Sequence, residues 1–213
     1  MTINIHAEQP RLQIGTELEK ASCAVILLHG RGSTAQTMVP LAQVINPGTA
    51  ALLIPQAAGN TWYPHSAFGP IEDNEPHLSS ALDCIATLVE ELHGQGFADE
   101  QIVFGGFSQG ACLAAEYVAR HAARYGGLFV LSGALIGPPG TARDYAGSFA
   151  GMPVFLGGSD VDPWVAHHLI AETAAVFERM DAQVDFRTYP GIAHTVIQDE
   201  VDAVRKMLLS VKA

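Results

Sequence analysis

The sequence predicts an α/β fold in which a mostly parallel sheet carries helices on both faces. Hydrophobic residues make up 48% of its 213 residues, which is enough for a large core. Short apolar runs alternate with helical patterns, as in parallel strands joined by right-handed crossovers. The runs are rich in Val, Ile, Leu and Phe, as in strands buried on both faces, and they span 23–28, 50–54, 101–104, 128–131, 153–156 and 184–188.

The clearest helix is expected over 78–92, where apolar side chains recur at helical spacing. Ser79 or Ser80 can cap its start, and Gly94 and Gly96 can end it. The other helices are expected in the stretch "ACLAAEYVARHAARY" and over about 164–180 and 195–209.

We expect one domain over 1–213, because no linker, repeat or low-complexity tract interrupts the chain. Acidic residues outnumber basic ones by 22 to 11, and the net charge of -11 argues against nucleic acid as a partner. Three cysteines without close pairing suggest reduced thiols, so we expect a cytoplasmic protein. No signal-like segment and no apolar run of bilayer length occurs, so stable membrane insertion is not expected.

Four irregular segments follow predicted strands. They are "HGRGS" (29–33), "GFSQG" (106–110), "GGSDVDPW" (157–164) and "YPGIAHT" (189–195). Function in open parallel sheets lies at the carboxyl ends of strands, so these segments should meet at one edge. They would bring together a serine, two aspartates and a histidine.

A serine, a histidine and an aspartate are the residue types that nucleophilic catalysis uses. A serine hydroxyl such as that of Ser108 reacts poorly unless a base takes its proton, and His194 can be that base. A carboxylate would hold the imidazole in the right tautomer. Asp160 and Asp162 compete for this role, and the one that does not fill it would stabilise the turn or cap the following helix. Ser108 as a mere turn residue is the weaker interpretation, because glycines stand two residues away on both sides.

The stretch 106–110 fits G-x-S-x-G, the nucleophile elbow of α/β-hydrolases, and the chain order Ser108, Asp162, His194 is that of this fold. The segments "LLHGRGS", "GFSQG", "SDVDPWV" and "YPGIAH" resemble the carboxylesterase, phospholipase and acyl-protein thioesterase family over nearly the whole chain. A serine nucleophile separates the chain from dienelactone hydrolases that carry a cysteine there.

The resemblance assigns the acid to Asp162, because the family places its acid directly before a residue matching Pro163. It also implies an oxyanion hole formed by the backbone N–H groups of Arg31 and Gln109. Gly30 and Gly32 would let the first loop turn its amides inward. The thioesterases usually carry an apolar residue where Arg31 stands and an acidic residue where Ser33 stands, which weakens a substrate preference inferred from them.

The long irregular segment 56–77 should border the site, as its counterpart does in the related esterases. Its Trp62 and Tyr63 either line the substrate pocket or pin the loop to the core, and the sequence favours neither. Phe107 and Trp164 are further candidates for the pocket wall. The interval 132–152 is rich in Gly, Pro and Ala and too short for a helical lid domain, so we expect an open cleft.

Together these features predict a serine hydrolase that cleaves carboxylic esters or thioesters through an acyl-enzyme. The alternative is a lysophospholipase or acyl-protein thioesterase with a longer substrate. A non-catalytic α/β-hydrolase that serves as a binding module is the rival from another class. We expect a small-molecule ester or thioester as the partner, with a homodimer as a further option. No cofactor and no metal are expected, since the remaining histidines lack ligand spacing.

Overall fold

The computed structural model describes residues 4–212, and its centre is a seven-stranded sheet in the order β1-β3-β2-β4-β5-β6-β7. All neighbouring strands are parallel except β1, which runs antiparallel to β3. The prediction of a mostly parallel sheet is confirmed. The strands are β1 (Arg11–Gly15), β2 (Cys23–Leu28), β3 (Ala50–Pro55), β4 (Ile102–Phe107), β5 (Gly127–Leu131), β6 (Pro153–Ser159) and β7 (Gln183–Tyr189).

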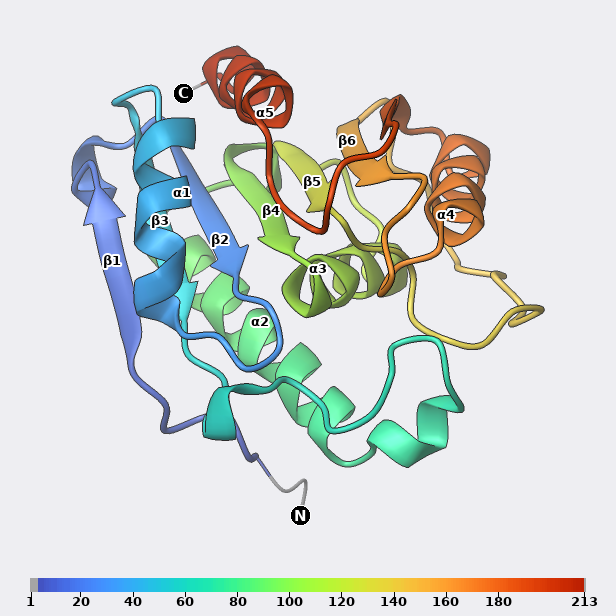
Figure 1. Cartoon of the computed structure of the whole chain (residues 1–213). Helices are drawn as coiled ribbons and strands as arrows, with labels where there is room; N and C mark the ends of the chain where they lie inside the picture. The colour runs from blue at the N-terminus through green and yellow to red at the C-terminus, as the bar shows by residue number, and fades with distance from the viewer. Residues whose placement is uncertain (1–3, 213) are drawn as a thin grey trace.

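Within residues 4–212, five α-helices cover the two faces of the sheet (Figure 1). They are α1 (Val39–Ile45), α2 (His77–Gly94), α3 (Gln109–Arg120), α4 (His167–Arg179) and α5 (Gln198–Ser210). The apolar sides of α2, α3 and α4 share one buried cluster, and those of α1 and α5 share another on the opposite face. Single 3₁₀ turns lie at Leu18–Lys20, Ala35–Met38, Ala58–Asn60, Ile71–Asn74 and Asp99–Gln101. The organisation as one domain stays a prediction, which this single sheet supports.

The structure differs from the sequence prediction at several helices and strands. Strand β1 and helix α1 were not predicted, and α4 and α5 begin three residues later than expected, at His167 and Gln198. The start of α2 is not capped by a serine. The Ser79 N–H instead donates to Glu75 Oε2 at 3.1 Å, and Ser80 is buried and accepts a hydrogen bond from the His6 N–H. Gly96, with φ +93°, follows the end of α2 as expected.

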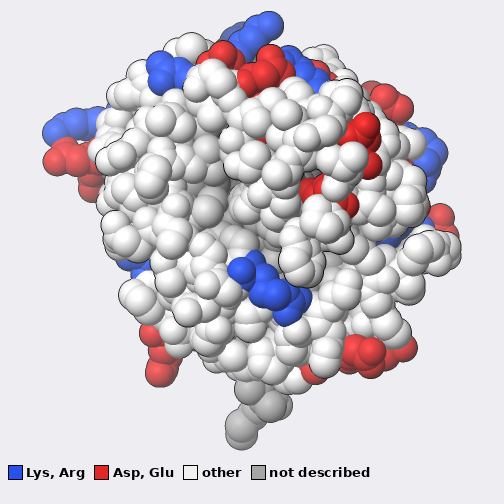
Figure 2. Space-filling view, in the orientation of Figure 1, with Lys and Arg blue, Asp and Glu red and all other residues white. Residues whose placement is uncertain are grey.

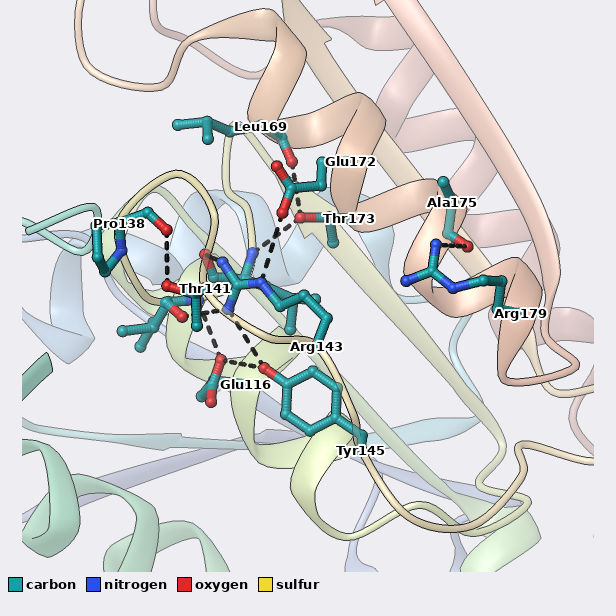
Figure 3. Close-up of polar contacts among 12 residues, drawn as sticks. Glu116, Pro138, Thr141, Arg143, Tyr145, Leu169, Glu172, Thr173, Ala175 and Arg179 are labelled. Atoms are coloured by element: carbon teal, nitrogen blue, oxygen red, sulfur yellow. Dashed lines mark hydrogen bonds and ion pairs between the residues drawn. The ribbon is translucent and has the colours of Figure 1, made fainter.

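The interval between β5 and β6 contains no helix, as the sequence predicted. Polar contacts fix it to α3 and α4 (Figure 3). Buried Glu116 of α3 accepts hydrogen bonds from the Ile136 N–H and the Tyr145 hydroxyl, each at 3.0 Å. The Arg143 guanidinium donates to backbone oxygens of the same interval and lies 3.6 Å from Glu172 of α4. The loop is therefore held in place by its polar side chains.

Candidate active site

Ser108 stands at the junction of β4 and α3 in a strained backbone conformation, with φ 55° and ψ -120°. Its N–H donates to Leu131 O at 2.9 Å, which ties the turn to β5. Gly106 and Gly110 are required here. A Cβ on Gly110 would lie 2.3 Å from Leu28 O, and one on Gly106 would lie 2.6 Å from the carbonyl carbon of Gly110. The sharp turn therefore presents the hydroxyl of Ser108 above the sheet.

His194 and Asp162 form a directly bonded pair. Nδ1 of His194 lies 2.6 Å from Asp162 Oδ2, and because a carboxylate only accepts, Nδ1 carries the proton of this bond. The Asp162 side chain is fully buried, and its Oδ1 also accepts from the N–H groups of Trp164 and Val165 at 2.8 and 3.1 Å. Three hydrogen bonds thus fix the carboxylate, and Nε2 of a neutral His194 is left as an acceptor.

Asp160 has a different place. Its Oδ1 accepts from the Gly191 N–H at 2.8 Å, which joins the loop after β6 to the loop after β7. Of the two aspartates, Asp162 is therefore the one bonded to His194, and Asp160 joins the two loops.

The backbone N–H groups of Arg31 and Gln109 are the ones that the family resemblance suggests for an oxyanion hole. Neither the Arg31 nor the Gln109 N–H donates to an acceptor within residues 4–212. Gln109 opens α3, so its N–H has no intrahelical partner. Gly32 has φ +70°, which favours glycine and bends the loop after Arg31. Gly30 needs no such freedom, because a Cβ there would meet only ordinary contacts at 3.5 Å or more.

A cavity of about 770 Å³ opens over these groups, and both Ser108 and His194 line it. Figure 2 shows a hollow on this face over the carboxyl ends of β2 and β4, walled mostly by uncharged side chains. Phe107 and Trp164 line the cavity as expected, and the Phe107 ring centroid lies 4.7 Å from that of His194. Tyr63 also lies at the cavity wall, with none of its surface exposed to solvent. Trp164 is 71% exposed, which places it at the rim. Cys112 also lines the cavity, which the sequence interpretation did not foresee.

Trp62 is not part of the cavity wall. It is fully buried, and its Nε1 donates to His29 O at 2.9 Å. Its ring centroid lies 5.5 Å from that of His6 and 5.0 Å from that of His29. For Trp62, the structure thus favours the alternative in which it pins the loop to the core, because the indole fills the space between two buried histidines.

These histidines hold the start of the 56–77 loop through their ring nitrogens. His29 Nε2 accepts from the Ala57 N–H at 3.0 Å, and His6 Nδ1 accepts from the Ala58 N–H at 3.1 Å. Burial lowers the pKa of both rings, so that both stay neutral acceptors near pH 7. His6 had no signal in the sequence, because its partners lie 52 and 56 residues away.

The arrangement joins a strained serine, a histidine held by a buried carboxylate and two free amides around one cavity. The chain matches the family model described as Phospholipase/Carboxylesterase over residues 10–211. Acyl-protein thioesterase 1 of Saccharomyces cerevisiae is 27% identical over 215 residues, which cover 90% of this chain and 93% of that protein.

Solved structures of similar proteins have the same fold. A phospholipase/carboxylesterase from Dyadobacter fermentans has a TM-score of 0.92 and 38% identity, covering 99% of this chain and 100% of its own. A carboxylesterase from Mesorhizobium loti shares the fold, with a TM-score of 0.72, 23% identity and 95% coverage of each chain. The chain belongs to the phospholipase/carboxylesterase family, and with it to the serine hydrolases that act on esters or thioesters.

Proposed function

We propose that Ser108 is the nucleophile, His194 the general base and Asp162 the acid that orients it. The observation that carries this proposal is the 2.6 Å contact between His194 Nδ1 and Asp162 Oδ2 on the cavity that Ser108 also lines. The N–H groups of Arg31 and Gln109 are proposed as the oxyanion hole. The cavity walls formed by Tyr63, Phe107 and Trp164 would hold the substrate.

The reaction follows from these roles. Ser108 Oγ attacks the carbonyl carbon while His194 Nε2 takes the hydroxyl proton, and the new oxyanion accepts hydrogen bonds from the two amides. The tetrahedral intermediate collapses, the C–O or C–S bond breaks, and His194 returns the proton to the leaving alcohol or thiol. Water then attacks the acyl-enzyme with His194 again as base, which releases the acid and restores Ser108.

A fluorophosphonate probe tests the proposal, because it phosphonylates only an activated serine. The wild-type protein should incorporate one probe, and Ser108→Ala should incorporate none. Ser66→Ala removes another serine of the cavity wall and should still label. Ester turnover by Ser108→Ala and His194→Ala should fall about a thousandfold or more. A wild-type protein that neither labels nor turns over esters would indicate the non-catalytic binding module instead.

The alternative of an acyl-protein thioesterase or lysophospholipase is favoured by the curated relatives, several of which are acyl-protein thioesterases. The same triad chemistry would serve it, because only the leaving group differs. Turnover of paired oxygen esters and thioesters with the same acyl chain distinguishes these activities. A preference for thioesters over the whole acyl series would move the assignment to this alternative.

We also propose that the protein works in the cytoplasm. All three cysteines are free and at least partly buried, and burial raises the pKa of Cys23 and Cys84 to about 11 and that of Cys112 to about 12. Such thiols suit a reducing compartment and react slowly. Within residues 4–212, no helix combines the length and apolar character needed to cross a bilayer.

A further inference from the structure

We propose that the substrate carries an anionic group, a carboxylate or a phosphate, a few bonds from the scissile carbonyl, and that the Arg31 guanidinium binds it. This inference rests on the proposed function, since it concerns the substrate of the same site. It goes beyond the family description, Phospholipase/Carboxylesterase, by assigning one residue to the anionic group and by placing that group close to the scissile carbonyl.

The charge distribution around the cavity is the first support. Among the described residues that line it, Arg31 is the one with a permanent charge, and none is acidic. The protein as a whole carries a net charge of -11. A molecule so acidic repels anions over most of its surface, so a cavity that offers only a cation is matched to an anionic ligand. Figure 2 shows a basic group at the edge of the hollow on this face.

The placement of the guanidinium is the second support. Its two terminal nitrogens donate to the backbone oxygens of Pro64 and His65, and its carbon lies 5.9 Å from the centroid of the Tyr63 ring. No carboxylate within residues 4–212 forms an ion pair with Arg31. Two of its five N–H groups are thus used, and three remain for a ligand.

The loop that contains Pro64 and His65 is itself fixed, so the guanidinium is held in position before a ligand binds. Buried Asn74 accepts from the His65 N–H at 2.8 Å and donates to Ser66 O at 3.0 Å. A pre-oriented planar fork suits the two oxygens of a carboxylate or phosphate. Arg31 is itself exposed at the cavity, so its attraction for an anion acts partly through water and depends on ionic strength.

The position of Arg31 also limits where the anionic group sits. The N–H of this residue is proposed to bind the oxyanion, and its side chain leaves from the same Cα atom. The charge should therefore lie within one arginine side chain of the reacting carbonyl, as in half-esters of short dicarboxylic acids or in acyl esters of a phosphorylated alcohol.

Matched substrate pairs test the inference. A p-nitrophenyl hemiglutarate is compared with its methyl ester, and 1-acetylglycerol 3-phosphate is compared with 1-acetylglycerol. The readout is the ratio of kcat/KM for the anionic and neutral member of each pair, so that any effect on the shared oxyanion hole cancels. The first pair places the charge on the acyl side, and the second places a phosphate on the alcohol side.

The wild-type protein should prefer the anionic member of at least one pair. This preference should fall about tenfold to a hundredfold in Arg31→Gln, which is the range expected for a hydrogen bond to a charged group. Arg31→Lys should retain part of it, and added salt should reduce it. Arg124→Gln removes an arginine outside the cavity that donates to Ala150 O, and the ratio should not change.

Two results would overturn the inference. One is a wild-type protein that prefers neither anionic member, and the other is an Arg31→Gln variant with unchanged ratios. In both cases, hydrolysis of the neutral esters and fluorophosphonate labelling at Ser108 would leave the proposed function standing. Loss of labelling and of all turnover in the wild-type protein would contradict the proposed function itself.

Discussion

The side-chain oxygen of Gln109 accepts a hydrogen bond from the Trp62 backbone N–H at 3.0 Å. The side-chain nitrogen of Gln109 donates to Tyr63 O at 2.8 Å, and Thr61 Oγ1 also donates to the Gln109 oxygen at 3.2 Å. The residue that follows the proposed nucleophile is therefore bound through its side chain to the loop that forms one cavity wall. Its backbone N–H, the proposed oxyanion donor, is positioned by the same contacts.

Gln109→Leu should lower kcat by about tenfold or more and should also lower Tm. The substitution leaves the buried Trp62 N–H without an acceptor, which costs about 1–3 kcal/mol, while Tyr63 O keeps the hydrogen bond from Thr61 Oγ1 at 2.9 Å. Steady-state kinetics with a short-chain ester and thermal unfolding measure the two effects. Gln101→Leu is the control, because within residues 4–212 the Gln101 side chain bonds to Ala98 and Ser22, which do not line the cavity, and the kcat of this variant should stay at the wild-type value. A Gln109→Leu protein with reduced Tm but wild-type kcat would restrict Gln109 to a structural role.

Asp162→Asn should lower kcat by about a thousandfold or more, because an amide in place of the carboxylate favours the wrong imidazole tautomer. Asp160→Asn should have a small effect, since the amide oxygen can still accept from the Gly191 N–H. The pH dependence of kcat/KM for both proteins completes the comparison. Greater damage from the Asp160 change would reverse the assignment of the two carboxylates.

The inner part of the fold was predictable because its signals are local. Strands β2 and β3 are buried on both faces, so nearly every position is apolar and the run itself reveals the strand. Strand β1 has no such run, since it lies at the sheet edge with alternating exposure and only five residues. Helix α1 is seven residues long and carries too short an apolar stripe to stand out.

The site was predictable to a different extent at each position. The elbow and the histidine loop are marked by residues that the proposed chemistry requires, so Ser108 and His194 could be proposed from their neighbours in sequence, and their roles stay predictions. The roles of Trp62 and Tyr63 were not separable, because a loop has no periodicity that tells an inward from an outward side chain. Only the structure shows that His6 and His29 enclose Trp62, while Tyr63 faces the cavity.

Glu116→Ala should destabilise the fold by about 3–5 kcal/mol, the range expected when one partner of a buried charge network is removed. Its carboxylate is 2% exposed and accepts from Arg120, Ile136 and Tyr145 at 2.7–3.0 Å. Urea unfolding gives the free energy. Glu172→Ala is the control, because its side chain is 40% exposed and its contact with Arg143 is long, so a loss below about 1 kcal/mol is expected. Equal losses in the two variants would mean that Glu116 does not anchor the 132–152 interval.

Glu200 is expected to make stability depend on pH. This residue of α5 lies six positions after His194, is 1% exposed, and its Oε2 accepts from the Ile197 N–H at 2.9 Å. Its other oxygen packs on Gly157, where no Cβ would fit, and burial raises the pKa of its carboxyl from 4.5 to about 7. The remaining charge that faces it is Asp199, which also raises this pKa and is itself bound to Arg187 and Tyr189.

A raised carboxyl pKa means that the folded state binds a proton that the unfolded state has lost between pH 4.5 and about 7. The stabilising contribution is therefore complete below pH 4.5 and disappears as the pH rises through 7, with a total on the order of 3 kcal/mol. Glu200→Gln keeps the size and shape of the side chain but removes the carboxyl group that titrates. The free energy of unfolding of both proteins is measured in urea at steps from pH 4.5 to 8. As the pH rises, the value for Glu200→Gln minus that for the wild-type protein should increase by about 3 kcal/mol. Asp202→Asn removes an exposed carboxylate from the same helix and should run parallel to the wild-type curve. If the curves of Glu200→Gln and the wild-type protein are parallel, Glu200 is already ionised in the folded state at pH 5, and its burial beneath the histidine loop has no linkage to protonation.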